Sequence, residues 1–155
     1  MIFALAKLSS VIPGFNERVQ TEADLFGIAE TEKITVAFDD MPTLKGFSCR
    51  TIEGDKERDY IFLDYRLRGT ELVYIGFHEL FHYFLHVPRG KKKPSVNFYT
   101  LARPSMEDAE ADAGALLCLY PATEIESLPY RMIYTDLFER MLMRKRILIY
   151  RRFGV

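Results

Sequence analysis

Two histidines and a glutamate lie close together near the middle of the chain, in the order His78, Glu79 and His82. In an α-helix, residues four positions apart lie one above the other on the same face, so both imidazoles can reach one metal ion. Glu79 lies about 100° around the helix from His78, beside the ion and not among its ligands. This H-E-x-x-H spacing is typical of sites in which two imidazoles hold Zn²⁺ and the glutamate takes a proton from water. We therefore predict that His78 and His82 bind zinc and that Glu79 is the catalytic base.

The segment that carries these residues, from about residue 70 to 86, is predicted to be a buried helix. Thr70 can cap its N-terminus, and Glu71 suits the positive end of the helix dipole. Apolar side chains surround nearly the whole helix, namely Leu72, Val73, Ile75, Phe77, Leu80, Phe81, Phe84 and Leu85. Buried histidines and glutamates are costly unless they are paired or coordinated, which favours a metal site over ordinary core histidines. His86 lies about 80° off the ligand stripe and is expected to pack or to support a ligand.

The composition indicates one ordinary globular domain, residues 1–155. The chain is 48% hydrophobic and 28% charged, and its net charge of −1 gives no overall attraction to nucleic acid. Two cysteines are too few for a disulfide scaffold or a Cys-rich zinc module, and they favour a reducing cytoplasm. No run of residues reaches the roughly 18 apolar positions that a membrane helix needs. We expect a soluble, cytoplasmic protein that has no membrane partner and whose apolar N-terminus is part of the fold.

Three short strands are predicted before the metal helix. Asn16 can cap a preceding helix that runs to about Ala29. The strands are expected at 34–38, at 45–51 and at about 59–64, because turn-forming residues separate these segments. Short connections favour a small antiparallel or mixed sheet that packs on the metal helix. The predicted fold class is therefore α+β, a single domain with further helices around the central H-E-x-x-H helix.

A second helix, predicted at about 105–120, is the natural source of a third metal ligand. Its first turns carry four acidic residues: Glu107, Asp108, Glu110 and Asp112. The chain has no third histidine at the spacing of the metzincin sites, so a carboxylate from this helix is expected to complete the site. Some of these acidic residues are also expected to stabilise the helix itself. Ser105 and Asp108 resemble a capping box, and negative charge is favourable in a first turn.

Two segments of the chain are basic. Residues 87–104 are predicted to be a long loop, and its Lys91, Lys92 and Lys93 are interpreted as a solvated tip in preference to a binding site. A basic C-terminal helix is predicted at about 134–152, with the cations Arg140, Arg144, Lys145, Arg146, Arg151 and Arg152. This strip could bind nucleic acid or an acidic partner. Cations that cover apolar surface near a helix C-terminus are the favoured interpretation.

The metal helix and the acidic helix together resemble the ImmA/IrrE family of metallopeptidases. The resemblance covers about residues 15–121 and depends on the segments VYIGFHELFHYFLH and AEADAGALLCLYP. It implies a zincin-like fold and a zinc-dependent endopeptidase that cleaves a regulatory protein, often a helix-turn-helix transcriptional repressor. By position, it implies that His78 and His82 are zinc ligands, that Glu79 is the general base, and that Asp108 is the third ligand with Asp112 as its companion.

One departure from the family leaves alternatives open at the third ligand. The family has a glutamate where this chain has Asp108, which is shorter by one methylene group. Either the second helix lies closer, or Glu107 is recruited, or the site is weakened, and Glu110 or water are the remaining candidates. A rival hypothesis comes from a different functional class. In it, the protein is a zinc-containing regulatory module that does not cleave and uses its basic C-terminus to hold a protein partner or DNA.

Overall fold

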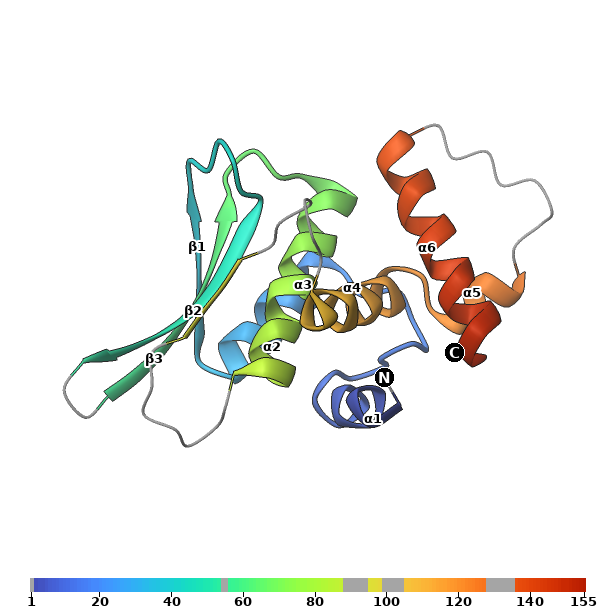
Figure 1. The fold of residues 1–155 in the computed structure, drawn as a ribbon, viewed down its shortest axis with the longest axis horizontal. Coiled ribbons are helices and arrows are strands. Elements are labelled where there is room, and N and C mark those ends of the chain that lie inside the picture. The colour runs from blue at the N-terminus through green and yellow to red at the C-terminus, as the bar shows by residue number, and fades with distance from the viewer. Residues whose placement is uncertain (1, 54–55, 88–94, 99–104, 128–135) are drawn as a thin grey trace.

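The structure is a computed structural model that describes residues 2–53, 56–87, 95–98, 105–127 and 136–155. In chain order, the elements of these ranges are α1 (Ile2–Val11), α2 (Glu22–Thr31), β1 (Ile34–Asp39), β2 (Gly46–Glu53), β3 (Lys56–Asp64), α3 (Gly69–His86), β4 (Ser95–Phe98), α4 (Met106–Leu119), α5 (Ala122–Ser127) and α6 (Leu137–Phe153). The predicted α+β class is confirmed (Figure 1). None of the helices in the described ranges combines the length and the apolarity that crossing a membrane requires.

The strands form one mixed sheet in the order β1-β3-β2-β4. β1 is parallel to β3, with Ile34 opposite Asp59, whereas β2 is antiparallel to both β3 and β4. The three predicted strands are confirmed. The prediction of a loop throughout residues 87–104 is wrong at Ser95–Phe98, which pairs with β2 from Phe47 to Arg50. Ser95–Phe98 alternates polar and apolar residues, but a pattern of this length is a weak signal, and the pairing with β2 identifies β4.

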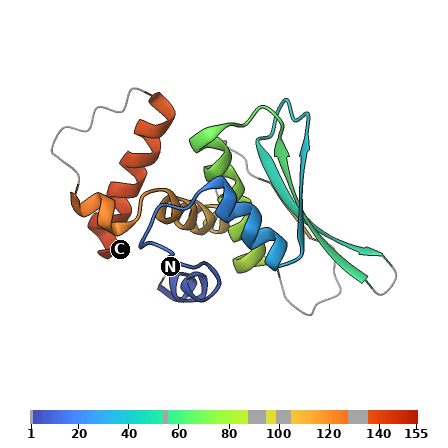
Figure 2. The same ribbon diagram turned by 180° about the vertical axis from the view of Figure 1, so that it is seen from behind.

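The helices form successive layers on one side of the sheet. Figures 1 and 2 show α2 and α3 next to the sheet, α4 beyond them, and α6 at the far end from the sheet. The core consists mainly of apolar side chains from α2, α3, α4 and the inner face of the sheet, with further contributions from α1 and α6. Because α3 lies between the sheet and α4, nearly its whole circumference is buried, as its apolar composition predicts. The H-E-x-x-H segment is therefore the centre of the domain.

Two predicted helix starts are wrong. α2 begins after Thr21, whose side chain forms a capping box with Asp24, and not after Asn16. Asn16 instead has a φ of 60°, a left-handed conformation that asparagine tolerates, and its side chain accepts a hydrogen bond from the backbone of Ala122. α3 begins at Gly69 without a side-chain cap. The hydroxyl of Thr70 donates to Glu139 on α6, so a tertiary contact replaces the predicted cap.

Candidate metal centre

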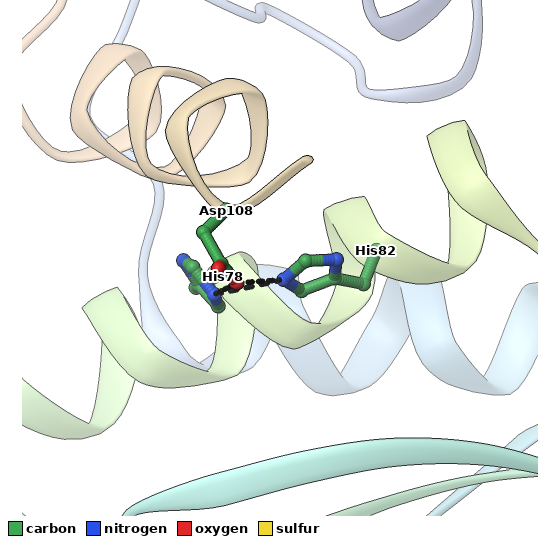
Figure 3. A group of neighbouring side chains, drawn as sticks. All are labelled: His78, His82 and Asp108. Carbon is green, nitrogen blue, oxygen red and sulfur yellow. Dashed lines mark hydrogen bonds and ion pairs between the residues drawn. The ribbon is translucent and has the colours of Figure 1, made fainter. Parts of the chain in front are cut away.

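Three side chains from α3 and α4 converge on one point, as Figure 3 shows. The Nε2 atoms of His78 and His82 are 3.0 Å apart, and Oδ1 of Asp108 is 3.2 Å from Nε2 of His82 and 4.0 Å from Nε2 of His78. Ligand atoms at the corners of a tetrahedral zinc site are separated by about 3.3 Å, given bond lengths of about 2.0–2.1 Å. The distances of 3.0 and 3.2 Å lie close to this value, and the distance of 4.0 Å between Asp108 and His78 is longer. This group could therefore hold a metal ion.

Burial makes the same arrangement difficult to explain without a ligand. His78 is 0% exposed, His82 is 2% exposed and Asp108 is 7% exposed. Burial, with His78 and His86 nearby, lowers the pKa of His82 to about 4, so its imidazole is neutral at physiological pH. Neutral imidazoles and a carboxylate are the forms that bind a metal. Ring nitrogens and an anionic oxygen directed at one buried point thus fit a cation.

Asp108 acts both as a helix cap and as a member of the ligand group. Its Oδ2 accepts a hydrogen bond of 2.6 Å from the backbone N–H of Ser105, while the Ser105 hydroxyl accepts one from the backbone of Asp108. Its other oxygen, Oδ1, faces the two histidines. The predicted capping box at Ser105 is confirmed, and it leaves one carboxylate oxygen available for a metal.

The other two acidic candidates on α4 point elsewhere. Glu107 is exposed, and Oε2 of Glu110 lies 3.9 Å from Nε2 of His86. Small residues explain how the shorter aspartate reaches the histidines. α4 packs against α3 through Gly114, where an added Cβ would lie only 2.4 Å from the ring of Phe81, so the two helices approach closely. Recruitment of Glu107 in place of Asp108 is not what this geometry shows, because Glu107 is exposed and Asp108 faces the histidines.

Asp112 supports His78 from the opposite side of the imidazole. Its Oδ1 lies 3.0 Å from Nδ1 of His78 and accepts a hydrogen bond from the Tyr74 hydroxyl, and its Oδ2 accepts one of 2.9 Å from Nζ of Lys145. Burial raises the pKa of Asp112, but these three partners outweigh burial and lower it to about 2. An ionised carboxylate can only accept, so Nδ1 of His78 carries the proton and Nε2 presents a lone pair to the ligand group.

The expected companion role of Asp112 fits this geometry, but sequence reasoning missed two of its partners. Tyr74 precedes His78 by four residues, so helical spacing could have indicated that both lie on the same face. Lys145 lies on α6, 33 residues from Asp112 in the sequence, so no local sequence pattern indicated this contact. His86 lies outside the ligand group, with its ring 5.3 Å from that of His82. The Nδ1 atom of His82 has no hydrogen-bond partner within the described residues.

Glu79 lies on the sheet-facing side of α3, where it is fully buried. Neither of its carboxylate oxygens makes a hydrogen bond of ordinary geometry with the described residues. Burial raises its pKa to about 8, and the charge of Asp108 adds to the rise, while Ser48 on β2 offsets part of it. A buried carboxyl group without an ordinary hydrogen bond to the described residues is costly, and a buried group with a strongly raised pKa is a candidate functional residue.

The predicted basic strip does not form one surface. Arg146 is fully buried and donates to the backbone oxygen of Tyr120 and to Oδ1 of Asn16. Lys145 turns inward to Asp112, whereas Arg144 and the remaining C-terminal arginines are exposed. The charged groups of Lys145 and Arg146 therefore do not belong to one exposed basic strip, because their positions on α6 direct them toward α4. The basic residues of 89–93, and Arg103, lie outside the described residues.

Comparison of the chain with protein-family models, with curated proteins and with solved structures finds no match. The resemblance to the ImmA/IrrE family therefore depends only on the sequence motifs. Function has to be argued from the geometry of the site.

Proposed function

We propose that this protein is a zinc-dependent endopeptidase of zincin-like fold that cleaves a regulatory protein, with a helix-turn-helix repressor as the expected class of substrate. The observation that carries the proposal is Glu79. A buried carboxyl group that makes no ordinary hydrogen bond with the described residues lies beside a group of three potential metal ligands. With a repressor as substrate, the site of action would be the cytoplasm.

The donor set supports zinc. Two imidazole nitrogens and one carboxylate oxygen, from His78, His82 and Asp108, are ligands that Zn²⁺ prefers in proteins. Three protein ligands leave a fourth position for water or substrate, which is typical of catalytic sites, whereas structural sites usually have four protein ligands. When bound, zinc would lower the pKa of water and polarise the carbonyl group of a peptide.

Glu79 and Asp112 would then have separate tasks in peptide hydrolysis. Glu79 accepts a proton from water while the water oxygen forms a bond to the carbonyl carbon of the substrate. It then donates this proton to the amide nitrogen as the C–N bond breaks, so the products are a carboxylic acid and an amine. A pKa raised by burial toward neutrality suits both transfers, because an efficient acid–base group has a pKa near the working pH. Asp112 keeps His78 in the tautomer that presents Nε2.

A regulatory module that holds zinc but does not cleave is the second candidate. Near-complete burial of the ligand group and of Glu79 favours it, because a peptide substrate has to reach the water beside Glu79. In this candidate, the exposed arginines at the C-terminal end of α6, Arg151 and Arg152, would contact a protein partner or DNA.

The experiment is co-expression with any repressor-like protein that is encoded beside this chain, scored for a fragment of that protein. The endopeptidase proposal expects a fragment with the wild type and none with Glu79→Gln, while both proteins carry close to one zinc per chain. His82→Ala should lose the metal. A partner that stays bound and intact with the wild type would favour the regulatory module. Equal zinc in the wild type and in His82→Ala would overturn the metal site.

A further inference from the structure

We propose that Lys145 on the C-terminal helix is a positioning residue of the metal centre, which it supports by holding Asp112 against His78. This inference depends on the proposed metal site but not on cleavage. It makes α6 a third structural component of the centre, beside α3 and α4.

The geometry links Lys145 to the ligand group through two consecutive contacts. Nζ of Lys145 donates to Oδ2 of Asp112 at 2.9 Å, and Oδ1 of the same carboxylate lies 3.0 Å from Nδ1 of His78. The opposite ring atom, Nε2 of His78, is the one that faces His82 and Asp108. A change in the rotation of the Asp112 carboxylate would therefore change the direction of the His78 lone pair.

The two oxygens of Asp112 have different partners. The contribution of Lys145 can therefore be measured separately from those of Tyr74 and His78. Tyr74 and His78, both on α3, contact Oδ1, whereas the ammonium group of Lys145 contacts Oδ2. The contact on Oδ2, from a different helix, adds a third restraint on the orientation of the carboxylate to the two contacts on Oδ1. The Asp112 side chain is 16% exposed and the Lys145 side chain is 40% exposed, so the carboxylate is largely shielded while the lysine lies at the protein surface.

The rest of α6 is attached in a way that directs Lys145 inward. At its N-terminal end, Glu139 accepts a hydrogen bond from Thr70 at the start of α3. In the following turns, the buried guanidinium of Arg146 donates to the carbonyl oxygen of Tyr120 at the end of α4. These two attachments hold the helix on either side of Lys145. Figure 1 shows α6 beside α4, on the side away from the sheet.

The test compares the zinc affinity of purified variants by competition with a chelator. Lys145→Met keeps the aliphatic stem and removes the donor, and Lys145→Gln is a second variant in case the first does not fold. Loss of an outer-sphere partner typically costs about 10–100-fold in metal affinity, and a residue one contact further out should lie near the low end, at about 10-fold. Lys145→Arg should restore most of the affinity. Arg144→Met, at the neighbouring exposed position, is the matched control and should bind zinc like the wild type.

Cobalt supplies a second reading that a loss of stability would not produce. In Co²⁺-loaded protein, Lys145→Met should shift the visible absorption bands because the His78 ligand is reoriented, and Lys145→Arg should return them. Wild-type affinity and unchanged bands in Lys145→Met, with a loss of affinity in Asp112→Asn, would overturn the role of Lys145 and leave the metal site intact. A wild type that binds neither metal would overturn both. Absence of cleavage alone bears only on the proposed peptidase activity.

Discussion

The polar side chains on the two sides of α3 differ in their hydrogen bonding. On the side facing α4, Asp108 and Asp112 hold hydrogen bonds to Ser105, Tyr74 and Lys145 and approach the histidines at hydrogen-bond distance. On the side facing the sheet, Glu79 is packed against β2 and lacks an ordinary hydrogen bond to any described residue. The first side is organised by contacts within the protein. The second retains a buried carboxyl group whose pKa is lowered only in part by Ser48.

The pKa values of Asp112 and Glu79 differ for the same reason. Three hydrogen-bond partners lower the pKa of Asp112 to about 2, although burial alone would raise it. Burial raises the pKa of Glu79 to about 8, because Ser48 offsets only part of the cost. Asp112 is therefore suited to a permanent charge, and Glu79 to gaining and losing a proton near neutral pH. Two acids whose environments separate their pKa values in this way are typical of a site where proton transfer occurs.

The largest effect is expected from removing a ligand on the α4-facing side. Asp108→Ala should lower zinc affinity by more than the roughly 10–100-fold that loss of an outer-sphere partner costs. Ser105→Ala is the matched control, because it removes the cap, at about 1 kcal/mol of folding stability, and leaves the Asp108 carboxylate in place. Chelator competition and thermal unfolding of both variants separate the two functions of Asp108. Equal zinc affinity in the wild type and Asp108→Ala would make Asp108 only a cap.

In the metal-free protein, Glu79 on the sheet-facing side of α3 should make the folding stability depend on pH. The folded-state pKa of Glu79 is raised from its ordinary 4.5 to about 8, so between these values the folded protein holds a proton that the unfolded chain has released. Its contribution to stability is fully present below pH 4.5 and is lost as pH rises toward 8. The slope cannot exceed about 1.4 kcal/mol per pH unit, and about 2 kcal/mol is expected between pH 5 and pH 7.

Denaturant unfolding of the wild type and Glu79→Gln at several pH values measures this contribution. The stability difference between the two proteins isolates Glu79, because their other ionisable groups are shared. Glu79→Gln should gain stability relative to the wild type as pH rises from 5 to 7. A constant difference would mean that the Glu79 carboxyl group titrates at its ordinary pKa and is not desolvated.

The two sides of α3 can also be compared by adding one methyl group to the element that packs on each side. In Gly114→Ala, the new Cβ would lie 2.4 Å from the Phe81 ring, so α4 should move away from α3 and carry Asp108 with it. Stability should fall by about 1–3 kcal/mol, and zinc affinity should fall as well. In Gly46→Ala, the new Cβ would lie 3.2 Å from Cγ of Glu79 and 3.0 Å from Ile75. This variant should lose less stability and keep its zinc affinity.

Zinc titration of both glycine variants tests whether the two sides are independent. Reduced zinc affinity in Gly46→Ala that matches the loss in Gly114→Ala would show that the ligand group and the base respond as one unit. In that case the contrast between the two sides of α3 would not hold.

Features encoded within a few neighbouring residues could be predicted from the sequence. His78 and His82 share a face because a helix has a fixed pitch, and the apolar positions around them require burial of that helix. The capping box of Ser105 and Asp108 spans three residues, and the alternation of β1 to β3 is equally local. The acid-rich start of α4 also marked the segment that supplies the third potential ligand.

Tertiary structure alone decided the features that depend on how distant segments meet. The rotation and close approach of α4 select Asp108 over Glu107, because neighbouring helical residues point about 100° apart. The pairing of β4 with β2, the contact of Lys145 with Asp112 and the burial of Glu79 against β2 join segments far apart in the chain. Spacing in the sequence determines which side chains share a face of one helix. Only the packing of several elements determines which of those side chains gain a partner and which, like Glu79, are buried without an ordinary hydrogen bond to the described chain.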